Sequence, residues 1–159
     1  MEASIHFALT KWYVDCVDSA GRTAIAYWAS FAWHAIAFTW HDVAVYEADR
    51  PRFERMSLAP VAAPEHLNGE IVWRAPALGC TIRAETRQPP TNVRLLDSTD
   101  GAVEWRCEAP VAETTIEVMG HAPIHGPGYA ERLTLTVLPW RLPIDVLRWG
   151  RWLSTGARV

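Results

Sequence analysis

Four side chains that can donate or accept a proton stand among aromatic residues in this sequence: Asp15, Tyr27, His34 and Glu131. A carboxyl group enclosed by apolar rings has a raised pKa, so it can act as a general acid near neutral pH. Such an acid can protonate an alkene or an enol, and the faces of Trp and Tyr rings stabilise the resulting cation. These four residues are therefore the candidate catalytic residues.

Asp15 has two interpretations, which depend on the direction of its strand face. It shares one face with Tyr13, and Trp12 and Val14 share the other. If Tyr13 and Asp15 point inward, the carboxyl group lies in an apolar pocket. If Trp12 and Val14, which are the better core pair, point inward, Asp15 faces water. The sequence is compatible with both orientations.

His34 and Glu131 each have a catalytic and a structural interpretation. His34 alternates in phase with Phe38, so it can enter a cavity as a general acid or base, or serve as a structural histidine at a barrel mouth. Glu131 is in phase with Tyr129 and Leu133 on the apolar face of a strong strand, where a charge needs a partner or a raised pKa. Near the start of that strand it can instead reach solvent at the rim.

Several classes of site lack their sequence signatures. GxSxG, GxxxxGK and GxGxxG motifs are missing, so serine hydrolase, kinase and dinucleotide-binding functions are not expected and no cofactor is predicted. His121 and His125 lie in a Gly- and Pro-rich loop without an acidic third ligand nearby, which predicts a neutral loop pair rather than a metal site. Cys16, Cys80 and Cys107 follow no CxxC pattern, so we expect buried free thiols rather than disulfides.

Charge and length restrict the remaining classes. A net charge of −3 and an isoelectric point near 6.0 argue against nucleic-acid binding, which needs a basic surface. The sequence has neither a charged leader before an apolar segment nor a run of 18 apolar residues, so a cytoplasmic protein without a membrane span is expected. The 159 residues suit one domain, expected to cover residues 1–159.

Period-two alternation recurs along nearly the whole sequence and predicts β-strands. It is clearest over residues 129–138, and residues 97–101 are typical of a hairpin turn. The stretch 21–48 is too long for one strand, so a turn is expected at Ser30 or at His41-Asp42. The pattern predicts an all-β fold, an antiparallel lipocalin-like β-barrel of about eight to ten strands, whose final strand would cover residues 146–152.

Tryptophan is enriched, with nine residues in the chain. Its rigid apolar ring with one N–H donor suits the lining of a cavity or an interface, although a Trp-rich core is the alternative. The residues expected to line a cavity and bind a substrate are Trp12, Trp28, Trp33, Phe38, Trp40, Trp105 and Tyr129.

Three segments carry a family resemblance. Lys11-Trp12-Tyr13-Val14-Asp15, Tyr27-Trp28-Ala29, and the segment from Gly128-Tyr129-Ala130-Glu131-Arg132-Leu133 to Trp149-Gly150-Arg151 resemble the carotenoid 1,2-hydratase and AttH-like lipocalin-related proteins. The resemblance implies a calycin-type barrel, often present as two modules in tandem. It also implies cofactor-free chemistry on lipophilic substrates, such as hydration of a carotenoid double bond or cyclisation of polyketide or terpenoid chains.

This chain resembles the first module of that family alone, because family members are commonly about twice as long. The acidic catalytic residue of the hydratase lies in the second module, so the resemblance transfers no catalytic residue to this chain. Two arrangements are compatible with the length. Either two copies pair as a homodimer, with one replacing the missing module, or the chain is a natural single-barrel relative.

Three functions therefore stay open. The first is a cofactor-independent cyclase, isomerase or hydro-lyase acting on a bulky lipophilic molecule, with one acid or base assisting. The second is a non-catalytic carrier of such a ligand, and the third is a half-barrel structural subunit whose aromatic residues form an interface. A buried ionisable group beside the aromatic residues would favour the enzyme.

Overall fold

The computed structural model describes residues 7–144 and 146, and their regular structure is almost entirely antiparallel β-sheet. The strands are β1 (Phe7–Val17), β2 (Thr23–Trp33), β3 (Ile36–Tyr46), β4 (Phe53–Ser57), β5 (Glu65–Leu67), β6 (Glu70–Ala75), β7 (Cys80–Thr86), β8 (Thr91–Ser98), β9 (Gly101–Val118) and β10 (Ile124–Leu135). Two short 3-10 helices, η1 (Pro76–Leu78) and η2 (Pro139–Arg141), complete the described elements. None of the described helices is long and apolar enough to cross a membrane. The predicted all-β antiparallel fold is confirmed.

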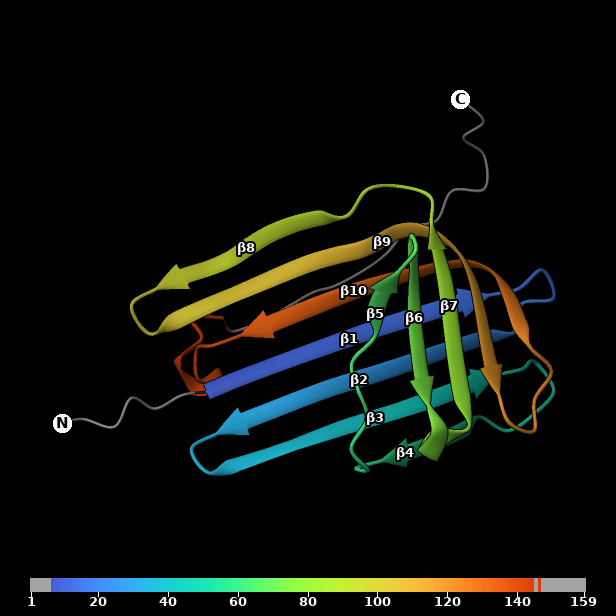
Figure 1. Ribbon diagram of the computed structural model, residues 1–159, viewed down its shortest axis with the longest axis horizontal. Helices are drawn as coiled ribbons and strands as arrows, with labels where there is room; N and C mark the ends of the chain where they lie inside the picture. Colours follow the sequence, from blue (N-terminus) through green and yellow to red (C-terminus); the bar gives the residue numbers. More distant parts are fainter. Residues whose placement is uncertain (1–6, 145, 147–159) are drawn as a thin grey trace.

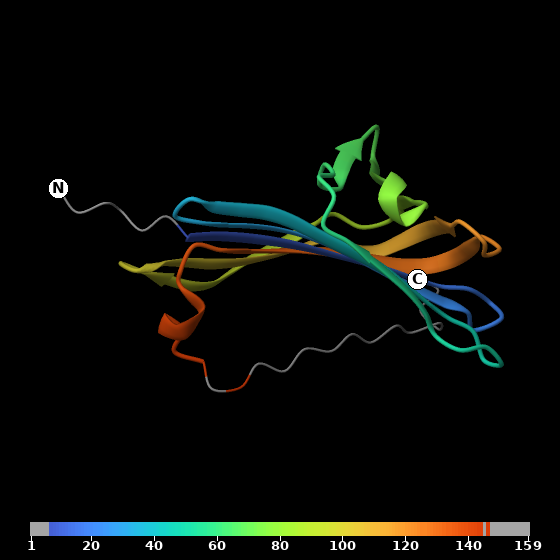
Figure 2. The same cartoon turned by 90° about the horizontal axis from the view of Figure 1, so that it is seen from below.

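The sheet curls because its longest strand changes neighbours along its length. The strand order is β4-β3-β2-β1-β10-β9-β7-β6-β5, and β8 pairs with β9 outside this path. Strand β9 pairs with β8 over residues 101–107 and with β7 over residues 112–118, and Pro110, which has no N–H to donate, lies between the two ladders. Strands β7, β6 and β5 consequently cover one face of the long strands (Figures 1 and 2). No ladder among the described residues joins the end strands β4 and β5, so the result is an open half-barrel.

The face that β5–β7 cover, here called the inner face, carries the main hydrophobic core. Even-numbered residues of β1 and β2 point into this core, as period-two alternation requires. Its buried members include Trp12, Val14, Cys16, Ala24, Ala26, Trp28, Val43, Val45, Ile71, Trp73, Ile82, Ile116 and Ile124. Trp12 and Val14, which the sequence suggested as the better core pair, therefore point inward.

Hydrogen bonds from two indole N–H groups hold the irregular segment before β5 against this core. The Nε1–H of Trp28 donates to the carbonyl oxygen of Val61 at 3.1 Å, and that of Trp73 donates to Ala62 at 2.9 Å. His41 is fully buried against Trp73 with a ring-centroid distance of 6.0 Å, and burial lowers its pKa. The inner face under β5–β7 is thus filled by side chains.

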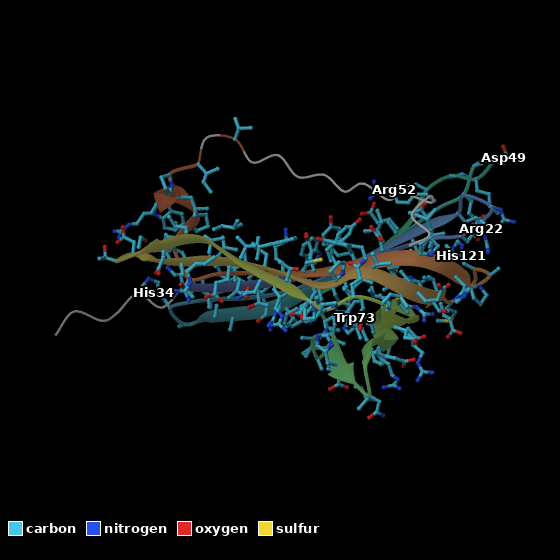
Figure 3. All side chains as sticks on the ribbon, turned by 90° about the horizontal axis from the view of Figure 1, so that it is seen from above. Arg22, His34, Asp49, Arg52, Trp73 and His121 are labelled. Carbon is cyan, nitrogen blue, oxygen red and sulfur yellow. The ribbon has the colours of Figure 1, made fainter. Side chains whose placement is uncertain are left out.

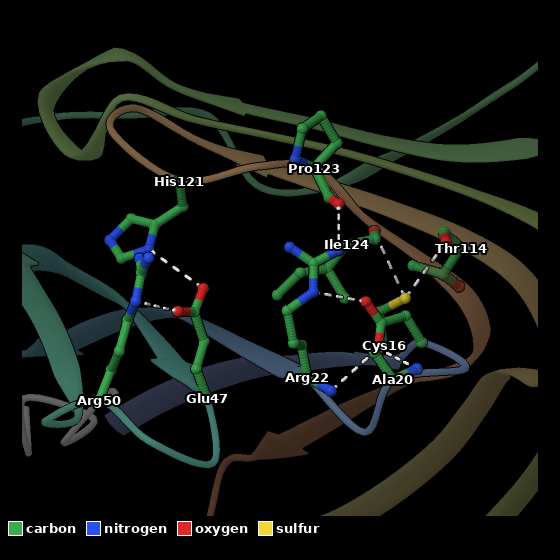
Figure 4. Close-up of polar contacts among 10 residues, drawn as sticks. Cys16, Ala20, Arg22, Glu47, Arg50, Thr114, His121, Pro123 and Ile124 are labelled. Atoms are coloured by element: carbon green, nitrogen blue, oxygen red, sulfur yellow. Dashed lines mark hydrogen bonds and ion pairs between the residues drawn. The ribbon is translucent and has the colours of Figure 1, made fainter.

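The cysteines belong to the buried structure, as the sequence predicted. Cys16, Cys80 and Cys107 are all buried, and none of them forms a disulfide. The thiol of Cys16 lies 3.2 Å from the carbonyl oxygen of Thr114 and 3.6 Å from that of Ile124, a position visible in Figure 4. Burial raises the pKa of Cys16 and of Cys80 to about 12, so both thiols stay protonated and unreactive at neutral pH.

The opposite side of the sheet, here called the outer face, has a second apolar cluster at one end. Phe7, Leu135, Val137 and Leu138 are buried in it. The chain after β10 folds back through η2 onto this side, away from β5–β7 (Figure 2). The rest of the outer face carries polar and aromatic residues from the central strands.

The expected turn between residues 21 and 48 was placed wrongly. Ser30 and His41-Asp42 lie inside β2 and β3, and the hairpin turns at His34-Ala35 because Trp33 pairs with Ile36. A two-residue hairpin turn requires a positive φ, and His34 adopts φ 53° there without the Gly or Asn that would have marked the turn. The hairpin predicted at residues 97–101 is confirmed by the pairing of Ser98 with Gly101. The final strand expected over 146–152 lies outside the described residues, apart from Val146.

The packing of the inner face predicts that two isoleucines contribute differently to the free energy of unfolding. Ile82→Ala removes a fully buried side chain between the two layers and is expected to lower the free energy of unfolding by about 2–5 kcal/mol. Ile36→Ala, the same change at a side chain that is 55% exposed, is expected to cost less than about 0.5 kcal/mol. Urea unfolding of both variants measures the difference, and equal losses would contradict the placement of the core.

Candidate functional site

The outer face carries a row of chemically active side chains across five strands. Asp42 of β3, Tyr27 of β2, Tyr13 of β1, Glu131 of β10 and Cys107 of β9 are successive ladder partners. Paired residues of an antiparallel sheet project to the same side, so the register alone collects these groups. Together with Asp15, Trp40, Trp105 and Tyr129, they form what we call the acid–aromatic face.

Two tyrosines hold two carboxylates at the centre of this face. The hydroxyl of Tyr13 donates to Asp15 Oδ2 at 2.9 Å, and that of Tyr129 donates to Glu131 Oε2 at 2.7 Å. In the β1–β10 ladder Tyr13 is opposite Glu131 and Asp15 is opposite Tyr129, so acids and phenols alternate in a square. Trp105 adds an indole N–H to Glu131 Oε2 at 2.6 Å. Asp15 is 5% exposed, so it does not face water even though Trp12 and Val14 fill the inner core.

Burial alters the protonation of Asp42. It is 8% exposed, and burial raises its pKa from 3.8 to about 6. The nearby Glu54 carboxylate acts in the same direction, while Arg52 opposes it. A carboxyl group with such a pKa exchanges its proton readily near neutral pH, which is the property required of a general acid or base.

Tyr27 connects Asp42 to the aromatic part of the face. It is the ladder partner of Asp42, its ring stacks on Trp40 at 6.4 Å, and it meets Tyr13 edge-on at 5.1 Å. The ammonium group of Lys11 lies 5.8 Å from the centre of the ring. Burial, followed by the charges of Asp42 and Glu131, raises the pKa of Tyr27 and keeps its hydroxyl a proton donor.

Three of the four candidate catalytic residues, Asp15, Tyr27 and Glu131, thus lie together on the outer face. His34 does not join them, because it sits in the β2–β3 turn against Trp33. Figure 3 shows His34 at the end of the molecule opposite Asp49.

The candidate aromatic residues divide between the two faces of the sheet. Trp40, Trp105 and Tyr129 belong to the acid–aromatic face. Trp12 and Trp28 are buried in the inner core. Trp33 and Phe38 lie at the far end of the outer face, where Phe31 contacts Phe38 at 5.1 Å.

Asp42 and Tyr13 were not selected from the sequence, although a signal for both was present. Asp42 continues the alternation of Phe38 and Trp40, but residues 41–42 were expected to form a turn, which hid this phase. Tyr13 was seen to share a face with Asp15, but its hydroxyl contact depends on side-chain geometry that the sequence does not specify.

Metal binding has no support in the part of the chain that the structure describes. No group of three or more His, Cys, Asp or Glu side chains there could hold an ion. His121 lies 3.8 Å from Glu47 (Figure 4). His125, expected in the same loop, instead belongs to β10 and lies 3.1 Å from Glu113, so the two histidines face different carboxylates.

Comparisons with known proteins show a similarity of fold alone. No family model matches the sequence, and no curated protein matches it. Among solved structures, the fold is similar to the crystal structure of an AttH-like protein from Nitrosomonas europaea, with a TM-score of 0.51 and 12% sequence identity. The match covers 84% of this chain and 52% of the other, so the chain spans about half the length of that protein. The fold of the chain is therefore similar to that of this AttH-like protein.

Proposed function

We propose that this chain binds a bulky lipophilic small molecule against the acid–aromatic face and catalyses a proton transfer on it without a cofactor. The reaction would be a cyclisation, an isomerisation or a hydration. The observation that carries the proposal is Asp42, a buried acid with a pKa raised to about 6 beside an aromatic surface.

The chemistry follows from the groups that surround this acid. Protonated Asp42 gives its proton to a carbon–carbon double bond, which leaves a carbocation on the substrate and a carboxylate on the enzyme. The rings of Tyr27 and Trp40 and the carboxylates of Asp15 and Glu131 stabilise that cation. Loss of a proton to Asp42 gives an isomer, attack by a second double bond followed by loss of a proton to Asp42 gives a ring, and capture of water followed by proton loss to Asp42 gives an alcohol.

A second candidate function, a subunit that pairs with a further copy of the chain, is favoured by the exposed end of the outer face. Ile36 and Phe38 are 55% and 48% exposed there. The AttH-like structure, of which the match covers 52%, supports the same possibility. A non-catalytic carrier is the outcome in which the ligand binds but no proton is transferred.

The aromatic side chains make the first prediction for this site. Trp40→Ala and Trp105→Ala each remove a ring that buries about 150–250 Å² and are expected to weaken binding of the neutral probe N-phenyl-1-naphthylamine by about 10-fold. Trp140→Ala is the matched control, because Trp140 is 68% exposed and lies away from the acid–aromatic face. It packs on Trp33, which is six residues, or roughly 20 Å, along β2 from Tyr27. Fluorescence titration measures the three affinities, and a uniform loss would argue against this face.

Asp42→Asn tests the buried acid through the pH dependence of stability. Folded Asp42 keeps its proton up to about pH 6, whereas the unfolded chain releases it near 3.8, so the stability of the parent chain falls as pH rises through this window. The variant should match the parent near pH 4 and exceed it by up to about 3 kcal/mol at pH 8. Urea unfolding at both pH values measures this. Asp49→Asn, at an exposed turn, is the control and should leave the stability unchanged at both pH values. An Asp42→Asn variant that is less stable than the parent at pH 8 would contradict the raised pKa of Asp42.

Native mass spectrometry of the protein after mild purification tests the function as a whole. The expected result is a retained lipophilic compound that gains deuterium at carbon when the complex is incubated in D2O, and Asp42→Asn should slow that gain by about 100-fold or more. A retained compound that gains no deuterium identifies a carrier. A dimer without any bound compound would refute the proposal and favour the subunit interface.

A further inference from the structure

A buried glutamate on the inner face anchors a group of cationic side chains that the proposed function does not use. Glu108 of β9 has a side chain that is 2% exposed. Its Oε2 accepts a hydrogen bond from Arg106 Nε at 2.8 Å and lies 3.0 Å from His66 Nε2, while its Oε1 lies 3.0 Å from Arg132 Nε. One carboxylate therefore faces two guanidinium groups and an imidazole.

The cluster has a surplus of positive charge. Arg106 and Arg132 are direct partners in the β9–β10 ladder, where like charges side by side are unfavourable unless an anion lies between them. Glu108 compensates one of the two charges and leaves the other. Among the described residues, the acid that could compensate the second charge from the next ladder position, Glu104, is already paired with Arg94 at 2.6 Å.

The guanidinium groups are also oriented to receive a further anion. Each directs its Nε toward Glu108, and both side chains are 40% exposed. In the described part of the chain, Glu108 is the only carboxylate that either arginine pairs with, so the terminal Nη groups stay available to a ligand. Arg132 is held over the ring of Trp12 at 5.6 Å, which fixes its plane. A planar, fixed fork of N–H donors suits an oxyanion.

We propose that Arg106 and Arg132 form an oxyanion-binding site, with the buried Glu108 as the residue that positions both guanidinium groups. The ligand chemistry is a carboxylate or a phosphate bound between the Nη groups. This site lies on the inner face, so it stands independently of the acid–aromatic face and of the function proposed for it.

Titrations with inorganic phosphate and with acetate at low salt test this site and separate the two anions. The readouts are the NMR signals of the arginine Nε–H groups and of the Trp12 indole, which contacts Arg132. We expect saturable shifts with at least one of the anions, at millimolar concentration. Arg106→Gln and Arg132→Gln should each weaken binding by about 10-fold. Arg141→Gln, which removes an exposed arginine paired with Asp100, is the control and should leave the affinity unchanged.

Glu108→Gln separates ligand binding from a purely structural role. Removing the internal carboxylate raises the net charge of the cluster, so the folded variant should bind the preferred anion about 3- to 10-fold more tightly even if it is less stable. Arg132→Lys keeps the charge but loses the planar fork, and it should weaken binding about 3-fold if Arg132→Gln does not fold. No saturable shift with either anion, arginine variants that bind the anion as tightly as the parent chain, or weaker binding by folded Glu108→Gln would overturn the proposal.

Discussion

The register of the ladders that join β3, β2, β1, β10 and β9 is the constraint on which the account depends. Side chains alternate between the faces of a strand, so a slip of one residue in any ladder would move every polar group of that strand to the other face. The observed register gathers Asp42, Tyr27, Tyr13 and Glu131 in one row. The same alternation sends Trp12 and Trp28 into the core.

The two faces of the sheet consequently contribute differently: the inner face to stability and the outer face to the candidate site. Under β5–β7 the inner face is filled by interlocking apolar side chains, and it supplies the stability that a single open half-barrel needs. The outer face can then hold features that cost stability, above all the buried Asp42 with its raised pKa. Beyond the edge of the core, the inner face keeps its own charged cluster around Glu108, whose two arginines reach solvent.

Much of the fold could be predicted from local patterns, whereas the site could be predicted only in part. Period-two alternation identified most strands and placed Glu131 in phase with Tyr129, because side-chain direction within a strand is a local property. Alternation does not say which face is covered, so the aromatic residues were assigned to one lining although the structure divides them. The turn at His34 was missed because a histidine at positive φ leaves no sequence signal, and that error concealed Asp42. The environment of Glu108 depends on β5 and β10, which are distant in sequence.

The most direct test of the central claim is a carbon-13 NMR titration of the Asp42 carboxyl group in the folded protein. Burial of the carboxyl group predicts a midpoint near pH 6, with the ring signals of Tyr27 shifting in the same step because the two residues are ladder partners. A midpoint near 3.8, the ordinary value of an aspartate, would show that Asp42 is an exposed acid and would contradict the account.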